Sequence, residues 1–257
     1  MHAAVHDAKD NNTLAVMRVV ALLCLIFGFV MQGLLDGQTF THAVLGIVFG
    51  AVAIFMYVGI EIGIPHFANL FMTSDAAHNG LSIDPTIAGT VTGTYWFLMM
   101  IGRIVGAAIG GKISSKVMLS VASSVGIIFV ILAIFLPATT TVSMPVFQSD
   151  ISFGLAQVPM GVMFLVLCGL CTSVMWGGIF NLAVEGLGKY TEAASGIFMV
   201  MVCGGGILPL FQGFIADVSA SYIVSYWVVF GALAYMLFYA FIGSKVHKRA
   251  EDVVFGS

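Results

Sequence analysis

Seven long apolar stretches, separated by short polar breaks, make up most of the chain. They cover about residues 14–35, 42–72, 86–111, 117–136, 153–180, 194–216 and 221–243. A helix needs about 20 apolar residues to cross the ~30 Å hydrocarbon core of a bilayer, whereas a transmembrane β-strand shows about ten alternating residues. Because the stretches are continuously apolar and too long for barrel strands, they predict an all-α, polytopic membrane bundle of about seven transmembrane helices.

The same pattern predicts three parts of the chain: a polar N-terminal segment over residues 1–13, the transmembrane bundle over 14–243 and a polar tail over 244–257. The apolar stretch that follows residue 13 is longer than the 7–15 residues of a signal-peptide core. We therefore interpret it as the first membrane crossing.

Composition excludes two broad classes of protein. Of the 257 residues, 60% are hydrophobic and 8% are charged, whereas soluble domains carry about 25% charged residues. So few charges cannot cover the surface of a soluble globular protein. The net charge of -3 and the lack of a basic run also argue against a nucleic-acid partner, which leaves the lipid bilayer as the surroundings of the chain.

The positive charges orient the predicted bundle. Three alternate breaks would lie on one side of the membrane, and that side holds seven of the nine Lys and Arg residues: Arg103, Lys112, Lys116, Lys189, Lys245, Lys248 and Arg249. An excess of Lys and Arg marks the cytoplasmic side. We therefore expect a multi-pass protein of the cell inner membrane with a cytoplasmic C-terminus.

The sequence favours no enzyme. It has no G-x-S-x-G, no H-E-x-x-H and no phosphate-binding Gly-Lys loop, so we expect no catalytic residue and no cofactor. Cys168 and Cys171 form a C-x-x-C, but no His or second cysteine pair accompanies them, which favours a packing role over a metal site.

Glu61 is the clearest ionisable residue deep within an apolar stretch. A charge near the bilayer centre costs about 2.5–3.5 kcal/mol on insertion scales, and such residues normally face the bundle interior or a water-filled cavity. Tyr57 lies four residues earlier, so both side chains share one helix face. A role in substrate contact or proton coupling is one interpretation, and a structural hydrogen bond to a neighbouring helix is the other.

Asn181 and Gln212 are further polar residues within apolar stretches. Sugars are bound by such mixtures, because amide and carboxylate groups bond hydroxyls while an aromatic face covers the apolar side of the ring. Together with Glu61 and Tyr57 these residues form the candidate substrate site.

Small residues recur at helical spacing. Gly102, Gly106 and Gly110 lie four apart, and glycine lets helix backbones approach closely in lipid. Pro65, Pro159 and Pro209 are expected to interrupt helices. Tight static packing and a bundle whose helices slide and bend both fit this pattern.

Four ordered strings resemble known permeases. They are similar to parts of the fucose and glucose/galactose permeases of the major facilitator superfamily. Phe55–Gly63 resembles the seventh helix, and Thr92 through Gly106, with Gly102-Arg103-Ile104-Val105-Gly106 at its end, resembles the eighth. Ile179–Leu182 with Gly186–Thr191 resembles the end of the tenth helix and the following loop, and Ser195–Asp217 resembles the eleventh helix. The resemblance covers about residues 40–243 and implies the C-terminal half of a twelve-helix transporter. It implies a sugar substrate, a hexose or deoxyhexose, and a coupling cation, proton or sodium.

The resemblance also implies roles and partners. Glu61, Tyr57 and Asn181 are expected to line the cavity. Arg103 is expected to act as a gating residue beside Gly102 and Gly106, where it ties helix ends together through hydrogen bonds to acidic groups or helix C-termini. An N-terminal six-helix half is expected to pack against this one, supplied by a split or longer gene, or replaced by a homodimer mate. The alternative is a truncated or partner-dependent membrane protein that does not transport.

Overall fold

The computed structural model describes residues 40–75, 79–148, 151–185, 187 and 191–245. The polar segment 1–13 and the first predicted crossing, 14–35, lie outside these residues, as does nearly all of the predicted tail.

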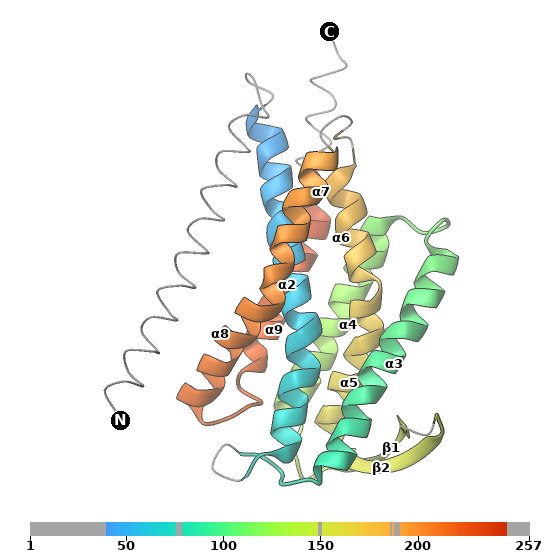
Figure 1. Ribbon diagram of the computed structural model, residues 1–257, viewed down its shortest axis with the longest axis vertical. Helices are drawn as coiled ribbons and strands as arrows, with labels where there is room; N and C mark the ends of the chain where they lie inside the picture. Colours follow the sequence, from blue (N-terminus) through green and yellow to red (C-terminus); the bar gives the residue numbers. More distant parts are fainter. Residues whose placement is uncertain (1–39, 76–78, 149–150, 186, 188–190, 246–257) are drawn as a thin grey trace.

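Among the described residues, six helical segments are long and apolar enough to cross a membrane. They run alternately up and down the bundle (Figure 1). Their helices are α2 (Phe40–Thr73), α3 (Pro85–Ile109), α4 (Ser115–Phe135), α5 (Met160–Ser173) with α6 (Met175–Val184), α7 (Thr191–Val200) with α8 (Gly204–Ser219), and α9 (Tyr226–Phe238). The prediction of a helical membrane bundle is confirmed, and six of the seven predicted crossings are found.

Local chemistry sets several helix ends. Asp84 caps α3 by accepting a hydrogen bond from the backbone N–H of Thr86 at 2.8 Å, and Pro85 occupies the first helical position. These hydrogen bonds favour the charged carboxylate and lower the pKa of Asp84. Ala220 ends α8 in a left-handed conformation, with φ of 50°.

One predicted helix begins later than expected. Residues 153–159 are not helical: Phe153–Pro159 form strand β2, which pairs antiparallel with β1 (Thr141–Phe147), and helix α5 starts only at Met160. Buried and exposed positions alternate along both strands, which is the strand period of two. Pro159 precedes the helix instead of interrupting it, whereas Pro65 and Pro209 do lie inside α2 and α8.

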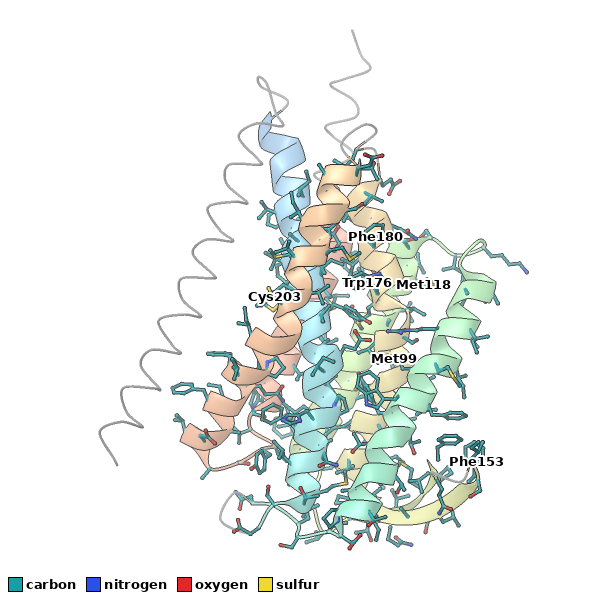
Figure 2. The ribbon with its side chains drawn as sticks, viewed as in Figure 1. Met99, Met118, Phe153, Trp176, Phe180 and Cys203 are labelled. Carbon is teal, nitrogen blue, oxygen red and sulfur yellow. The ribbon has the colours of Figure 1, made fainter. Side chains whose placement is uncertain are left out.

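The β1–β2 hairpin is fixed to α3. The backbone N–H of Phe147 donates to Thr94 Oγ1 at 2.9 Å, and the Phe97 ring stacks on the Phe147 ring with centroids 4.5 Å apart. Phe153 lies beside this pair at the edge of the molecule (Figure 2). The hairpin therefore lies beside α3 and α5, at the end of the bundle at which α2 and α8 finish (Figure 1).

Glycines let the helices of the bundle touch. A Cβ at Gly204 would overlap the backbone carbonyl of Phe55, so α8 begins in direct backbone contact with α2. Two residues later, Gly206 has no atom within 4 Å of such a Cβ. Lipid gives no hydrophobic driving force for helices to associate, so they associate through close van der Waals packing, which small residues at the contact allow.

This pair of glycines gives a matched test of the packing. We expect Gly204→Ala to lower the stability of the bundle by about 1–3 kcal/mol, because the methyl group would force two backbones apart. Gly206→Ala should leave it unchanged or raise it slightly, since alanine is the better helix former. Thermal unfolding of the two purified variants in one detergent checks this, and an equal loss in both would contradict it.

Candidate functional site

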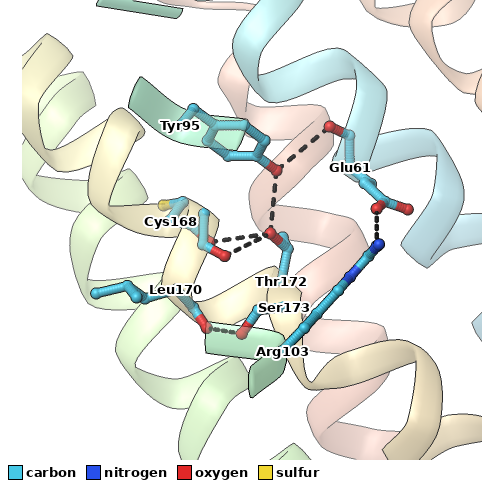
Figure 3. A network of polar contacts seen from close by, with 8 residues as sticks. Glu61, Tyr95, Arg103, Cys168, Leu170, Thr172 and Ser173 are labelled. Carbon is cyan, nitrogen blue, oxygen red and sulfur yellow. Dashed lines mark hydrogen bonds and ion pairs between the residues drawn. The ribbon is translucent and has the colours of Figure 1, made fainter. Parts of the chain in front are cut away.

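An ion pair joins α2 and α3 within the membrane-spanning region. Arg103 Nη2 lies 2.6 Å from Glu61 Oε1 (Figure 3). The Glu61 side chain is 13% exposed and the Arg103 side chain 55% exposed. A charge-assisted hydrogen bond of this length is about twice as strong as a neutral one, and it removes the cost of leaving either charge alone at this depth.

Hydroxyl groups hold the helices in place behind the ion pair. The Tyr95 hydroxyl donates to the Glu61 backbone carbonyl at 3.3 Å and lies 3.0 Å from Thr172 Oγ1. Thr172 in turn donates to the Cys168 carbonyl at 3.1 Å. These contacts connect α2, α3 and α5 in one network (Figure 3), so the position of Glu61 is fixed through its backbone as well as its carboxylate.

Tyr57 adds a buried hydroxyl beside the pair. It lies one turn before Glu61, and its hydroxyl neighbours both Glu61 and Arg103. Within the described part of the chain, this hydroxyl is buried without a hydrogen-bond partner. The Tyr57 ring contacts the ring of Trp176 on α6, with centroids 6.0 Å apart, and Figure 2 shows Trp176 at the middle of the bundle. A carboxylate, a guanidinium, a phenol and an indole therefore meet at one place.

Asn181 is not part of this group. It lies near the end of α6, where its Nδ2 donates to Ser115 Oγ at 3.4 Å. There it lines a separate cavity of about 590 Å³ with residues at the start of α4. The structure therefore separates Asn181 from the residues with which the sequence analysis grouped it.

Gln212 also lies elsewhere, in the helix packing. Its side chain is buried, its Nε2 donates to Ser225 Oγ at 3.3 Å, and its Oε1 faces Gly63 on α2. This arrangement explains the polar residue as a bridge between α2, α8 and the start of α9.

Gly102 and Gly106 allow α3 to approach α5 and α6. A Cβ at Gly102 would overlap Ser173, and one at Gly106 would lie 2.6 Å from Val174 Cγ1. Arg103 lies between these glycines, six residues before α3 ends at Ile109. Its partner is therefore a residue in the middle of α2, whereas the sequence analysis expected it to hold helix ends.

Arg103 was expected to bond an acidic group or a helix C-terminus, but Glu61 was not identified as its partner. The signal was available, because Glu61 and Arg103 are opposite charges in two consecutive apolar stretches, and membrane-embedded charges usually pair. The roles of Tyr95 and Thr172 carried no such signal, since either residue is common in helix cores.

Comparison with known proteins supports one fold. No family profile matches the chain. It is 32% identical to a glucose/galactose transporter of Brucella abortus biovar 1 (strain 9-941) over 199 residues. This alignment covers 77% of this chain and 42% of that protein. A putative glucose/galactose transporter of Helicobacter pylori (strain J99) is 29% identical over 207 residues, 79% of this chain and 45% of that protein.

A solved structure matches the bundle directly. The major facilitator transporter FucP, crystallised in the outward conformation, superposes with a TM-score of 0.62 at 17% identity, over 77% of this chain and 42% of FucP. The chain has a partial major facilitator fold. It resembles the C-terminal half of these transporters, as the sequence motifs predicted.

This partial major facilitator bundle spans less than half the length of the curated relatives named here. Glu61 and Arg103 lie on α2 and α3 of this bundle, which resembles the C-terminal half of those transporters. The ion pair therefore lies in the part of the fold that corresponds to the second bundle of a complete transporter.

Two tyrosines allow the buried hydroxyl of Tyr57 to be tested. We expect Tyr57→Phe to leave the melting temperature of this major facilitator bundle unchanged or slightly higher, because the lost hydroxyl has no partner among the described residues. Tyr226→Phe should lower it, since the Tyr226 hydroxyl donates to the Ile64 carbonyl at 2.7 Å, and a buried hydrogen bond is worth about 1 kcal/mol. Melting curves of both variants in one detergent check this; equal losses would show that Tyr57 has a structural partner.

Proposed function

We propose that this bundle is the C-terminal half of a cation-coupled permease that moves a hexose or deoxyhexose by alternating access. The relatives named as glucose/galactose transporters support a sugar substrate. An L-fucose-proton symporter of Escherichia coli K12, 31% identical over 61 residues, 24% of this chain and 14% of that protein, supports a coupling ion. That ion is a proton or sodium.

The proposal rests on four side chains that lie close together, those of Glu61, Arg103, Tyr57 and Trp176. Sugar hydroxyls both donate and accept, so a carboxylate and a guanidinium held side by side can bind two neighbouring hydroxyls. The Tyr57 hydroxyl offers a third contact once a shift of the helices opens the site, because it is buried beside Glu61 and Arg103 and makes no well-formed hydrogen bond among the described residues. Trp176 supplies an aromatic face for the apolar side of the sugar ring.

The same ion pair suggests how the substrate and the cation are coupled. A proton on Glu61, or a sugar hydroxyl bonded to it, would weaken its hold on Arg103. The two helices joined by the pair, α2 and α3, would then be free to shift relative to each other, assisted by the close packing at Gly102 and Gly106. In this proposal, the bond between Arg103 and Glu61 links the protonation and ligand binding of Glu61 to the position of α3 relative to α2.

A second helix bundle is part of the proposal. The Arg103 side chain is 55% exposed although it lies inside a membrane-spanning helix. A charged group in that position needs water or protein next to it, because lipid does not solvate it. The second bundle would come from another part of the same protein, from a separately encoded chain or from a second copy.

A non-transporting, partner-dependent membrane protein is the second candidate. The exposed Arg103 guanidinium favours it, because a single bundle supplies only one wall of a central cavity. Sugar uptake by liposomes that contain the purified chain alone separates the two candidates. Uptake that appears only after an N-terminal bundle is co-reconstituted would assign this chain a partner-dependent role.

Glu61 is the residue to test first. We expect Glu61→Gln to weaken sugar binding about tenfold, since a neutral hydrogen bond replaces a charge-assisted one, and to flatten the pH dependence of uptake if the coupling ion is a proton. Radiolabelled glucose, galactose and fucose binding measures the effect, with Glu192→Gln, an exposed acid in the first turn of α7, as the control. Unchanged affinity for all three sugars in Glu61→Gln would remove Glu61 from the site.

The orientation in the inner membrane can be tested separately. Lys112, Lys116 and Lys245 lie at the end where α3 and α6 finish, whereas the described residues of the opposite loops and the hairpin contain no Lys or Arg. We propose that the lysine-bearing end, with the C-terminus, is cytoplasmic.

Cysteine labelling in whole cells checks this orientation. A membrane-impermeant maleimide should label Ser143→Cys on the hairpin in intact cells, and should label Lys112→Cys only after the membrane is permeabilised. Both positions are exposed, so a difference between them reports on sidedness. Labelling of Lys112→Cys from outside would invert the proposed topology.

A further inference from the structure

A second polar cavity lies away from the Glu61 site. It has a volume of about 590 Å³ and is bounded by the start of α4, the end of α6 and the residues that follow α9. Its polar lining comes from Ser114, Ser115, Lys116, Asn181, Glu185, Ser244 and Lys245. None of these residues takes part in the network around Glu61 and Arg103, so the cavity needs an explanation of its own.

The chemistry of the lining favours a singly or doubly negative ligand. Among the described lining residues, two lysines accompany one acid, Glu185, which leaves a net positive charge. The Lys116 ammonium lies over the Phe241 ring, 5.7 Å from its centroid, a contact that leaves its charge intact. Serine hydroxyls beside two ammonium groups are typical ligands of phosphate oxygens.

Exposed apolar walls lie next to one of the lining residues, Lys116. Val117 follows it on α4, is 52% exposed and lines a separate apolar groove with residues of α3 and α5. Phe241, whose ring lies under the Lys116 ammonium, is 48% exposed. A soluble anion gains nothing from such walls, whereas a phospholipid places its phosphate among the lysines and its acyl chains along the exposed side chains of membrane-spanning helices.

We propose that this cavity binds the phosphate group of an anionic phospholipid. Basic pockets between transmembrane helices on the cytoplasmic side are known to hold such headgroups, and the cavity lies at the lysine-rich end of the bundle. The proposal is independent of sugar transport, because its residues lie on α4, α6 and the end of α9. It predicts that the lipid stabilises the contacts among these three helix ends.

The test compares lipids on the full-length chain. Purified protein in neutral detergent is titrated with phosphatidylglycerol or phosphatidylcholine, and the apparent affinity is read from thermal stabilisation and native mass spectrometry. We expect phosphatidylglycerol to bind more tightly than phosphatidylcholine. The double variant K116Q/K245Q should lose about 30-fold in affinity for phosphatidylglycerol, because each lysine near an anionic headgroup contributes about fivefold.

Lys112 gives the matched control. It is an exposed lysine in the same interhelical connection and does not line the cavity, so K112Q should keep the selectivity for phosphatidylglycerol. Equal binding of the two lipids, or an equal loss in K112Q and the double variant, would overturn the proposal. Inorganic phosphate at millimolar concentration is the third arm: stabilisation by phosphate alone, lost in the double variant, would identify a soluble-anion site and overturn the lipid assignment.

Discussion

A charge inside a membrane-spanning helix has to be solvated by the protein, and the Glu61–Arg103 ion pair is how this bundle meets that constraint. Lipid offers no hydrogen bonds, so each member of the pair lowers the free-energy cost of placing the other charge in the membrane. The consequence is mechanical, because the pair joins α2 to α3 at a distance of 2.6 Å. Any ligand or ion that competes for Glu61 acts at the same time on the contact between two helices.

The rest of the packing makes this contact possible. Gly102 and Gly106 remove side-chain bulk on both sides of Arg103, so α3 comes close to Ser173 and Val174, where the straight run of α5 and α6 is interrupted. The Tyr95 hydroxyl holds the Glu61 backbone from the opposite side. A few small residues and hydroxyls thus position two long charged side chains, which have many rotamers and little preference of their own.

The sequence predicts the bundle well because the bilayer imposes one length and one polarity on every crossing. The same argument fails at the hairpin. Residues 153–159 are apolar enough to continue the next helix, and only their alternation with period two, together with the paired strand 141–147, shows that they are strands. The hydropathy of a window averages this alternation away, so Pro159 was misinterpreted as a helix interruption instead of the residue that precedes α5.

The site was predicted less completely, for a different reason. Tyr57 and Glu61 lie close together, as their separation by one helical turn predicts, because local spacing is visible in a sequence. Asn181 and Gln212 belong to other helices, and their depth depends on where those helices begin and how they break. Polarity in an apolar stretch identifies a residue that needs a partner, but the partner is as often a serine on a neighbouring helix as a substrate.

The distribution of polar groups separates two surfaces with different partners. Glu61, Arg103 and Tyr57 come from α2 and α3, and the exposed guanidinium on that side requires protein or water next to it. Lys116 lies at the start of α4 and Lys245 beyond the end of α9, and the exposed Phe241 ring contacts the Lys116 ammonium. A charge beside apolar neighbours at a helix end fits the headgroup region, whereas a charge in mid-span does not. The position of each cation along the bundle is therefore the physical basis of both proposals, a second helix bundle beside Arg103 and a lipid headgroup beside the lysines.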